Sequence, residues 1–263
     1  MNILEQIAEY TKQRIEKDKK NISLEEMKKM AYACPIDDSF PFEQALRKPG
    51  ISFICECKKA SPSKGLIAPD FPYVEIAKEY EKAGASCISC LTEPKWFLGK
   101  DEYVKEISQV VNIPVLRKDF TVDEYMIYQA KVLGASCILL ICSILDEDTL
   151  KKYHDIATSL GLSCLVEAHD DKEVLMAKRI GAKIIGVNNR NLKDFTVDIH
   201  NAGRYRKLVD GDILFVAESG IKTHEDILAL MEDKVDAVLI GETLMRASDK
   251  KKMLDTLRGD TYE

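Results

Sequence analysis

The chain has no long hydrophobic run, and this absence excludes a membrane-spanning helix. None of its 263 residues lies in a stretch approaching the roughly 20 apolar residues that a membrane span needs. The first 20 residues are amphipathic and mixed in charge, so they lack the apolar core of a signal peptide. We therefore expect a cytoplasmic protein that binds no membrane.

The chain also has little concentrated positive charge. It contains 38 Lys and Arg residues against 44 Asp and Glu residues, for a net charge of −6. The basic segment KDKK at 17–20 is short and is typical of a solvated helix end. We therefore expect no nucleic-acid partner. With 46% apolar and 31% charged residues, the composition is that of a globular protein with a large core.

The eight cysteines do not form a recognisable metal or redox motif. Seven of them lie in apolar, strand-like runs, where Cys acts as a small hydrophobic residue. CISC at 87–90 has the spacing of a metal or redox pair, but residues three apart in a strand point to opposite faces. We expect these cysteines to pack in the core, and we expect no metal site.

Eight short apolar runs recur along the chain, each nearly continuous in hydrophobicity, as in parallel strands covered on both faces. They lie at 51–55, 85–91, 113–116, 135–142, 162–166, 182–187, 212–217 and 236–240. Segments with helical periodicity separate them. Several of these segments end in a glycine suited to a left-handed helix terminus, at Gly84, Gly134, Gly161 and Gly181. Thr223 and Asp226 form a capping-box pattern before another segment.

Eight β-then-α units predict an α/β protein with a (β/α)8 TIM barrel. A doubly wound sheet is the alternative, but no GxGxxG follows any predicted strand, which weakens a dinucleotide-binding interpretation. The sequence contains no long linker, so residues 1–263 are expected to form a single barrel domain. Residues 1–47 are expected to be a helical extension of two helices that covers one end of the barrel, with Ser23 and Glu26 capping the second helix.

Several predicted strands end in ionisable or polar side chains. Active sites of such barrels lie at the C-terminal ends of the strands. Strand alternation places Glu56 and Lys58 on one face, with Cys57 on the other. We expect six side chains to point inward: Glu56, Lys58, Lys118, Glu167, Asn188 and Glu218. Salt bridges that merely close the barrel end are the alternative, but burying so many charges is costly without a use for them.

The predicted cluster of charged side chains suits acid–base chemistry on an anionic substrate. Cations suit an anionic substrate, and adjacent lysine and carboxylate groups supply a general acid and a general base. Gly220 and Gly241 follow the last two strands, where backbone amides can approach a phosphate. Ser61 could add a hydroxyl, and Glu242 could contribute its amide. Ordinary turn chemistry is the alternative explanation for the two glycines.

Seven motifs in order resemble the strand-end motifs of the indole-3-glycerol phosphate synthase family. They are ECKKASPSKG, LTEPKWFLG, VLRKDF, LVEAH, IGVNNRNL, AESGI and IGETLM, from residue 56 to residue 245. The resemblance implies a carboxy-lyase of tryptophan biosynthesis that closes 1-(2-carboxyphenylamino)-1-deoxyribulose 5-phosphate into indole-3-glycerol phosphate, CO2 and water. It implies no cofactor, because the substrate carries its own electron sink. A monomer is expected.

The resemblance also implies roles for individual residues. Lys118 is expected to be the general acid and Glu167 its acid/base partner in dehydration. Lys58 is expected to bind the substrate carboxylate and Glu56 to hold the lysines. Substrate-binding or ordering roles are implied for Asn188, Arg190, Glu218 and Ser219. Phosphate binding is implied for Ser61, Gly220, Gly241 and Glu242.

Further expectations concern the walls of the site and the rival functions. A hydrophobic floor is expected from residues such as Phe120, Leu140 and Leu192, while Trp96 and Phe97 could either gate the ring site or simply pack. His169 is expected to play a local structural role rather than a catalytic one. The rivals are phosphoribosylanthranilate isomerase, the tryptophan synthase α subunit and a non-catalytic barrel that binds sugar phosphates.

Overall fold

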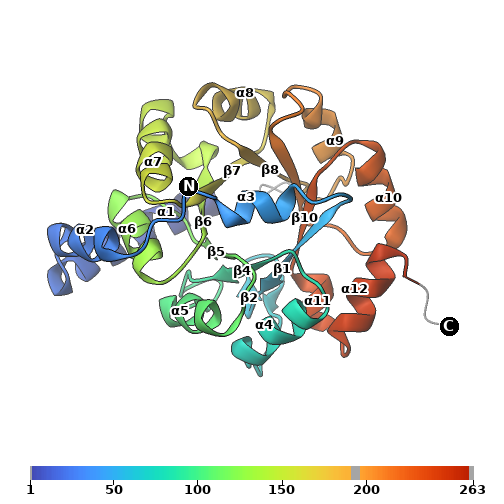
Figure 1. Ribbon diagram of the computed structural model, residues 1–263, viewed down its shortest axis with the longest axis horizontal. Coiled ribbons are helices and arrows are strands. Elements are labelled where there is room, and N and C mark those ends of the chain that lie inside the picture. Colours follow the sequence, from blue (N-terminus) through green and yellow to red (C-terminus); the bar gives the residue numbers. More distant parts are fainter. Residues whose placement is uncertain (1, 191–195, 261–263) are drawn as a thin grey trace.

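The computed structural model describes residues 2–190 and 196–260 (Figure 1). In this part of the chain, eight parallel strands form a closed barrel, in the order β1-β10-β9-β8-β7-β6-β5-β4. The strands are β1 (Ser52–Cys57), β4 (Cys87–Leu91), β5 (Val115–Lys118), β6 (Cys137–Ile141), β7 (Ser163–Ala168), β8 (Ile184–Asn188), β9 (Leu214–Glu218) and β10 (Ala237–Ile240). The predicted (β/α)8 barrel is confirmed, and closure between β1 and β10 excludes the open doubly wound sheet.

Helices surround the barrel (Figure 1). They are α4 (Tyr73–Lys82), α5 (Asp101–Val110), α6 (Glu124–Val132), the short 3-10 helix η1 (Cys142–Ile144), α7 (Glu147–Ser159), α8 (Asp171–Arg179), α9 (Asn201–Arg206), α10 (His224–Glu232), α11 (Glu242–Arg246) and α12 (Lys250–Arg258). Gly84 and Gly181 both have a φ of 85°, the left-handed conformation predicted for them. Thr223 and Asp226 form the predicted capping box at the start of α10.

The N-terminal segment forms three helices, not the two predicted. They are α1 (Ile3–Asn21), α2 (Leu24–Ala33) and α3 (Pro41–Leu46). Ser23 and Glu26 make the predicted capping box on α2. The third helix has only six residues, too few to show a helical period in the sequence, although Pro41 in its first turn is a common helix start.

These N-terminal helices contact both ends of the barrel. Phe42 of α3 is fully buried in the same cluster as Ile54 of β1, and the Ser52 hydroxyl donates to the Ala45 carbonyl where β1 begins. At the opposite end, Ile3 and Ile7 of α1 line the cavity described below. The segment therefore forms part of the barrel core as well as a wall of the cavity.

Two apolar layers follow from the period-two alternation of the strands. One fills the barrel interior and includes Ile54, Leu116, Leu139, Leu165 and Val216. The other lies between the strands and the helices and includes Cys55, Leu140, Val166, Ile185 and Phe215. Leu140 therefore faces the helices, and its predicted place in the floor of the site is wrong.

The cysteines pack as predicted. Cys87 belongs to the inner layer and Cys90 to the outer layer, so the CISC pair points to opposite faces. Burial raises the pKa of both thiols. Over residues 2–190 and 196–260, no group of three or more His, Cys, Asp or Glu side chains is placed to hold a metal ion. Among the described helices, none is long and apolar enough to span a membrane.

Candidate active site

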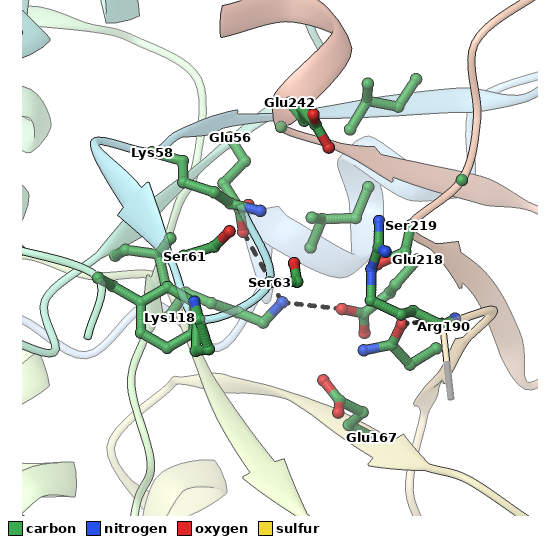
Figure 2. Close-up of a pocket in the computed structure, with 18 of the residues that line it drawn as sticks. Glu56, Lys58, Ser61, Ser63, Lys118, Glu167, Arg190, Glu218, Ser219 and Glu242 are labelled. Atoms are coloured by element: carbon green, nitrogen blue, oxygen red, sulfur yellow. Dashed lines mark hydrogen bonds and ion pairs between the residues drawn. The ribbon is translucent and has the colours of Figure 1, made fainter. Parts of the chain in front are cut away.

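A cavity of about 390 Å³ opens at the C-terminal ends of the barrel strands (Figure 2). The twelve residues singled out from the sequence all line it: Glu56, Lys58, Ser61, Lys118, Glu167, Asn188, Arg190, Glu218, Ser219, Gly220, Gly241 and Glu242. The structure thus brings together side chains from strands and loops that lie up to 186 residues apart in the sequence, from Glu56 to Glu242.

Four charged residues of the cavity belong to the strands themselves. Glu56, Lys118, Glu167 and Glu218 lie at or next to the last residue of β1, β5, β7 and β9. Each strand continues one or two residues beyond the apolar run seen in the sequence, because backbone pairing persists. For example, Glu167 pairs in register with Ile141 and Gly186, and Glu218 with Asn188 and Leu239. The ladder therefore holds these charges rigidly toward the barrel axis.

Ion pairs join the charges across the cavity. The Lys118 ammonium donates to Glu218 Oε2 at 2.8 Å, and Lys118 Nζ lies 3.8 Å from Glu56 Oε2 (Figure 2). Lys58 forms a close ion pair with Glu56 Oε1. The Ser89 hydroxyl, which points inward from β4, donates to Glu56 Oε2 at 3.3 Å. Glu56 thus bridges the two lysines; Ser89 was not predicted because a lone serine in a strand carries no functional signal.

These contacts fix the charge states of Glu56 and Lys118. Burial tends to raise the pKa of Glu56, but Lys58 and Lys118 outweigh burial, so that its pKa lies below the ordinary value. Burial tends to lower the pKa of Lys118, but Glu218, Glu56 and Glu167 outweigh it and raise the pKa. At neutral pH the cavity therefore holds a carboxylate at Glu56 and an ammonium at Lys118.

The pKa of Glu218 is raised, whereas that of Glu56 is lowered. Burial, together with the negative charges of Glu167 and Glu56, raises the pKa of Glu218 to about 7, although Lys118 opposes the shift. The carboxyl group is enclosed closely on its other side, because its Oε1 lies against Gly186 of β8, where a side chain would collide with it. Glu218 can therefore take up or release a proton near neutral pH.

Glu167 has a cationic neighbour outside the cavity. Its Oε1 lies 3.1 Å from His169 Nε2. Burial tends to raise the pKa of Glu167, but His169 and Lys118 outweigh it and the pKa is lowered. An interaction with the Asn188 side chain acts in the same direction. Glu167 is therefore a carboxylate at neutral pH, and its charge is balanced by His169 and Lys118.

The loops after β9 and β10 expose backbone groups to the cavity. Ser219 and Gly220 both have positive φ values, 69° and 85°, so the chain turns sharply just after Glu218. At Gly241 a Cβ atom would lie 2.6 Å from Glu56 Oε1 and 3.0 Å from Lys58 Nζ. The absence of a side chain at Gly241 thus leaves room for the Glu56–Lys58 pair.

Ser61 reaches the cavity from a small hairpin. β2 (Ala60–Ser61) pairs antiparallel with β3 (Gly65–Leu66) and forms this hairpin. Lys64 at the hairpin tip lies 3.5 Å from Glu242, whose carboxylate also accepts a hydrogen bond from Arg246 at 3.1 Å. The negative charge of Glu242 is thereby balanced beside the glycine loops. Lys222, Thr243 and Arg246 also line the cavity and were not predicted.

An apolar wall faces the charged groups. Phe97 and Phe120 both line the cavity, with ring centroids 6.4 Å apart, and Leu139 and Ile141 of β6 complete the wall in place of Leu140. Both faces of β6 are apolar, so nothing in its sequence marks which of them faces inward. Leu192 lies outside the described residues. Trp96 packs on Tyr10 of α1, with ring centroids 5.5 Å apart, so of the aromatic pair Phe97 is the one at the cavity.

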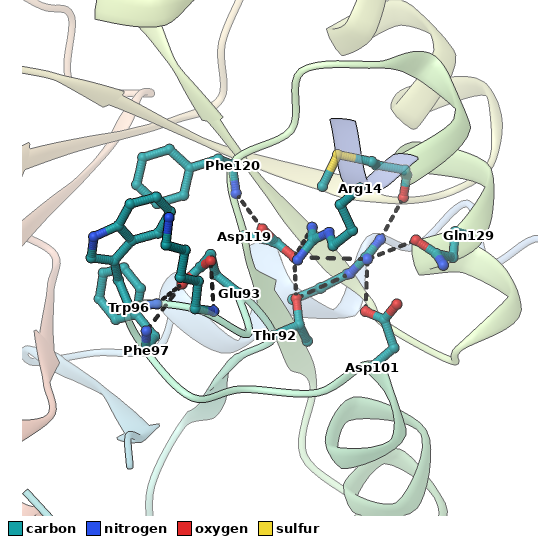
Figure 3. A network of polar contacts seen from close by, with 12 residues as sticks. Arg14, Thr92, Glu93, Trp96, Phe97, Asp101, Asp119, Phe120 and Gln129 are labelled. Carbon is teal, nitrogen blue, oxygen red and sulfur yellow. Dashed lines mark hydrogen bonds and ion pairs between the residues drawn. The ribbon is translucent and has the colours of Figure 1, made fainter. Parts of the chain in front are cut away.

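A buried polar network supports this wall (Figure 3). The Glu93 carboxylate accepts hydrogen bonds from the backbone N–H groups of Lys95, Trp96 and Phe97. Asp119, next to Lys118, accepts from Arg14 of α1 at 2.7 Å and from Thr92 at 2.6 Å. The contacts of Asp119 tie α1 to the end of β5, and those of Glu93 fix the loop that carries Phe97. Sequence reasoning missed the Asp119 contacts because Arg14 and Thr92 are 105 and 27 residues away in the chain.

Comparisons with known proteins agree with one another. Residues 4–257 match the family described as indole-3-glycerol phosphate synthase. The chain is 57% identical to the indole-3-glycerol phosphate synthase of Ruminiclostridium cellulolyticum, over 98% of this chain and 99% of that protein. It is 52% identical to the enzyme of that name from Lachnoclostridium phytofermentans, over 97% of this chain and 98% of that protein.

Solved structures with low sequence identity share the fold. The thiamine phosphate pyrophosphorylase of Pyrococcus furiosus matches with a TM-score of 0.61 at 18% identity, over 82% of this chain and 96% of the other. A chain of the tryptophan synthase complex of Pyrococcus furiosus matches with a TM-score of 0.60 at 14% identity, over 79% and 97%. At such identities the likeness concerns the barrel alone. The family match and the identity to its members, both over nearly the whole length, establish that the chain belongs to the indole-3-glycerol phosphate synthase family.

Proposed function

We propose that the protein closes 1-(2-carboxyphenylamino)-1-deoxyribulose 5-phosphate into indole-3-glycerol phosphate, with release of CO2 and water. The observation that carries the proposal is the Lys118 ammonium, placed between Glu218 and Glu56 on the floor of the cavity. A protonated amine at this point can donate to an oxygen on which negative charge develops. Family membership supports the same reaction.

The two ends of the substrate match two sides of the cavity. We assign its phosphate to the loops after β9 and β10, with backbone groups of Gly220 and Gly241 and the hydroxyls of Ser61 and Ser219. We place its benzene ring against Phe97 and Phe120. Its carboxylate then pairs with Lys58, and Glu56 holds Lys58 in place. Asn188 and Arg190 line the remaining side.

In the ring-closing step, the aromatic carbon that bears the carboxylate attacks the ketone carbon of the sugar. The C–C bond forms as Lys118 gives a proton to the ketone oxygen, which becomes a hydroxyl group. The resulting iminium accepts the electron pair released when the bond to the carboxylate breaks, so CO2 leaves and the aromatic ring is restored. The substrate supplies its own electron sink for this step.

Dehydration completes the reaction. Lys118 first regains a proton from solvent. The hydroxyl group then leaves as water with this proton, and Glu167 accepts the proton lost from the neighbouring carbon. The double bond of the indole forms between these two carbons. Glu167 suits this role because it is a carboxylate at neutral pH and lines the same cavity as Lys118. Glu218, hydrogen-bonded to Lys118, orients the ammonium group.

A fluorescence assay tests the proposal. Purified protein, mixed with the carboxyphenylamino sugar phosphate and no added cofactor, should produce the fluorescence of an indole. Phosphoribosylanthranilate, the substrate of the isomerase that shares the phosphate loops, serves as the alternative substrate. Turnover of that compound without indole formation would favour the isomerase. Binding of both compounds without any turnover would indicate a non-catalytic sugar-phosphate barrel, and either result would contradict the proposed function.

A further inference from the structure

His169 lies between two carboxylates at the outer side of the cavity. It directly follows β7, and its ring Nε2 is 3.1 Å from Oε1 of Glu167. Its Nδ1 is 3.2 Å from Oε2 of Glu173, in the first turn of α8. The backbone N–H of His169 also donates to Glu173 Oε2 at 2.8 Å. Glu173 thus contacts both the ring and the backbone N–H of His169.

The contacts with Glu167 and Glu173 favour a protonated His169 ring. A neutral imidazole has only one N–H, whereas an imidazolium donates from both nitrogens. The contact of Nε2 with Glu167 is an ion pair without hydrogen-bond geometry, whereas Nδ1 lies within hydrogen-bond distance of Glu173. Two carboxylates this close to the ring favour the imidazolium. Burial tends to lower the pKa of His169, but Glu167 and Glu173 outweigh it and raise the pKa to about 10.

Other charged and titratable groups surround this row of three side chains. In the described part of the chain they include Lys118 on β5, Cys142 of η1 and Asp170 at the start of α8. Arg190, Asp198 and Tyr205 line a second cavity together with His169 and Glu173. Lys118 is cationic and also lowers the pKa of Glu167, so that two positive charges act on this carboxylate.

We propose that His169 is a positioning residue: as an imidazolium anchored by Glu173, it orients the Glu167 carboxylate toward the substrate and stabilises its charged form. This inference rests on the proton-accepting role proposed above for Glu167. A positive charge 3.1 Å from one oxygen of a carboxylate restricts the orientation of that carboxylate. His169 does not line the substrate cavity, so it acts on the reaction only through Glu167.

Kinetics of three variants test the proposal. In His169→Ala the Glu167 carboxyl loses its outer cation, so we expect kcat at pH 7 to fall about 10-fold to 100-fold and KM to change less than about threefold. The acidic limb of the kcat profile should move about one pH unit higher, because protonated Glu167 cannot accept a proton. Glu173→Gln should shift the limb in the same direction by a smaller amount. Asp171→Asn removes an exposed charge from the same helix turn and should change neither quantity.

A spectroscopic measurement on the wild-type protein is independent of activity. Side-chain 15N–1H spectra of the four histidines should show one imidazolium, with both nitrogens protonated, that persists at pH 8 and disappears in His169→Ala. A neutral His169 at pH 8 would overturn the inference, even if a variant failed to fold. An active wild type whose His169→Ala and Glu173→Gln variants keep its pH profile would also overturn it. Absence of indole from the wild type would instead reject the proposed function, while the spectra would still report on His169.

Discussion

Lys118 Nζ lies 2.8 Å from Glu218 Oε2, although the two residues come from opposite sides of the barrel. In the closed strand order, three strands separate β5 from β9 in either direction. The ion pair therefore crosses the barrel interior at the level where the apolar layer ends and the cavity begins. The floor of the cavity is therefore formed in part by charged groups.

Replacement of Lys118 should separate catalysis from binding. Lys118→Ala should lower kcat by about 10²-fold to 10⁴-fold, the usual contribution of a general acid. The dissociation constant of the substrate should change only a few-fold, because the phosphate loops and the aromatic wall are intact. Indole fluorescence measures the change in kcat, and a ligand titration measures the change in the dissociation constant. An unimpaired Lys118→Ala enzyme would reject the role assigned to Lys118.

The neighbouring lysines Lys58 and Lys59 offer a matched comparison. Lys58 lines the cavity and pairs with Glu56, whereas Lys59 is absent from the cavity lining. Lys58→Ala should raise KM about 10-fold or more, because the substrate carboxylate loses its cation and Glu56 loses a partner. Lys59→Ala should keep both kcat and KM within about twofold of the wild type. Equal effects of the two substitutions would contradict the assignment of the carboxylate to Lys58.

Gly241 is predicted to tolerate no side chain. In Gly241→Ala the new methyl group would lie 2.6 Å from Glu56 Oε1, so the Glu56–Lys58 pair must shift. We expect kcat/KM to fall about 10-fold or more while the fold, measured by circular dichroism, is retained. Gly211→Ala is the control, because a Cβ there meets no atom within 4 Å and its φ is not positive. If Gly241→Ala were as active as this control, the close approach would have no catalytic meaning.

The raised pKa of Glu218 predicts a pH dependence of stability. A carboxyl group whose pKa is higher in the folded state than in the unfolded state binds protons preferentially when folded, so its contribution is lost as pH rises from about 4.5 to about 7. The Glu218→Gln variant lacks this titration. We expect the free energy of unfolding of the wild type to fall relative to that of the variant across this window, by up to about 3 kcal/mol.

Urea unfolding at pH 4.5, 5.5 and 7.0 measures this difference. Glu75→Gln, at an exposed residue of α4, controls for the loss of a carboxyl group elsewhere. A constant difference between wild type and Glu218→Gln over the three pH values would show that Glu218 titrates at the same pH in the folded and unfolded protein.

Residues with a strong local signal were predicted from the sequence. The eight apolar runs have the length of buried strands, and the capping pairs Ser23–Glu26 and Thr223–Asp226 depend only on contacts three residues apart. Period-two alternation likewise placed Glu56 and Lys58 on one common face, and the charges at several strand ends led us to expect that this face points inward. The strand β6 contains only apolar residues, so no charge indicates its inner face. The predicted place of Leu140 in the floor of the site was therefore wrong.

The sequence by itself determined the eight β/α units, the positions of the charged strand ends and, through its motifs, the family. Only the tertiary structure decided which of these charges meet: Lys118 with Glu218, Glu167 with His169, and Asp119 with Arg14. The physical reason is distance along the chain. Local propensity and alternation act over a few residues, whereas Lys118 and Glu218 are 100 residues apart and meet only because hydrogen bonding between β1 and β10 closes the sheet into a barrel.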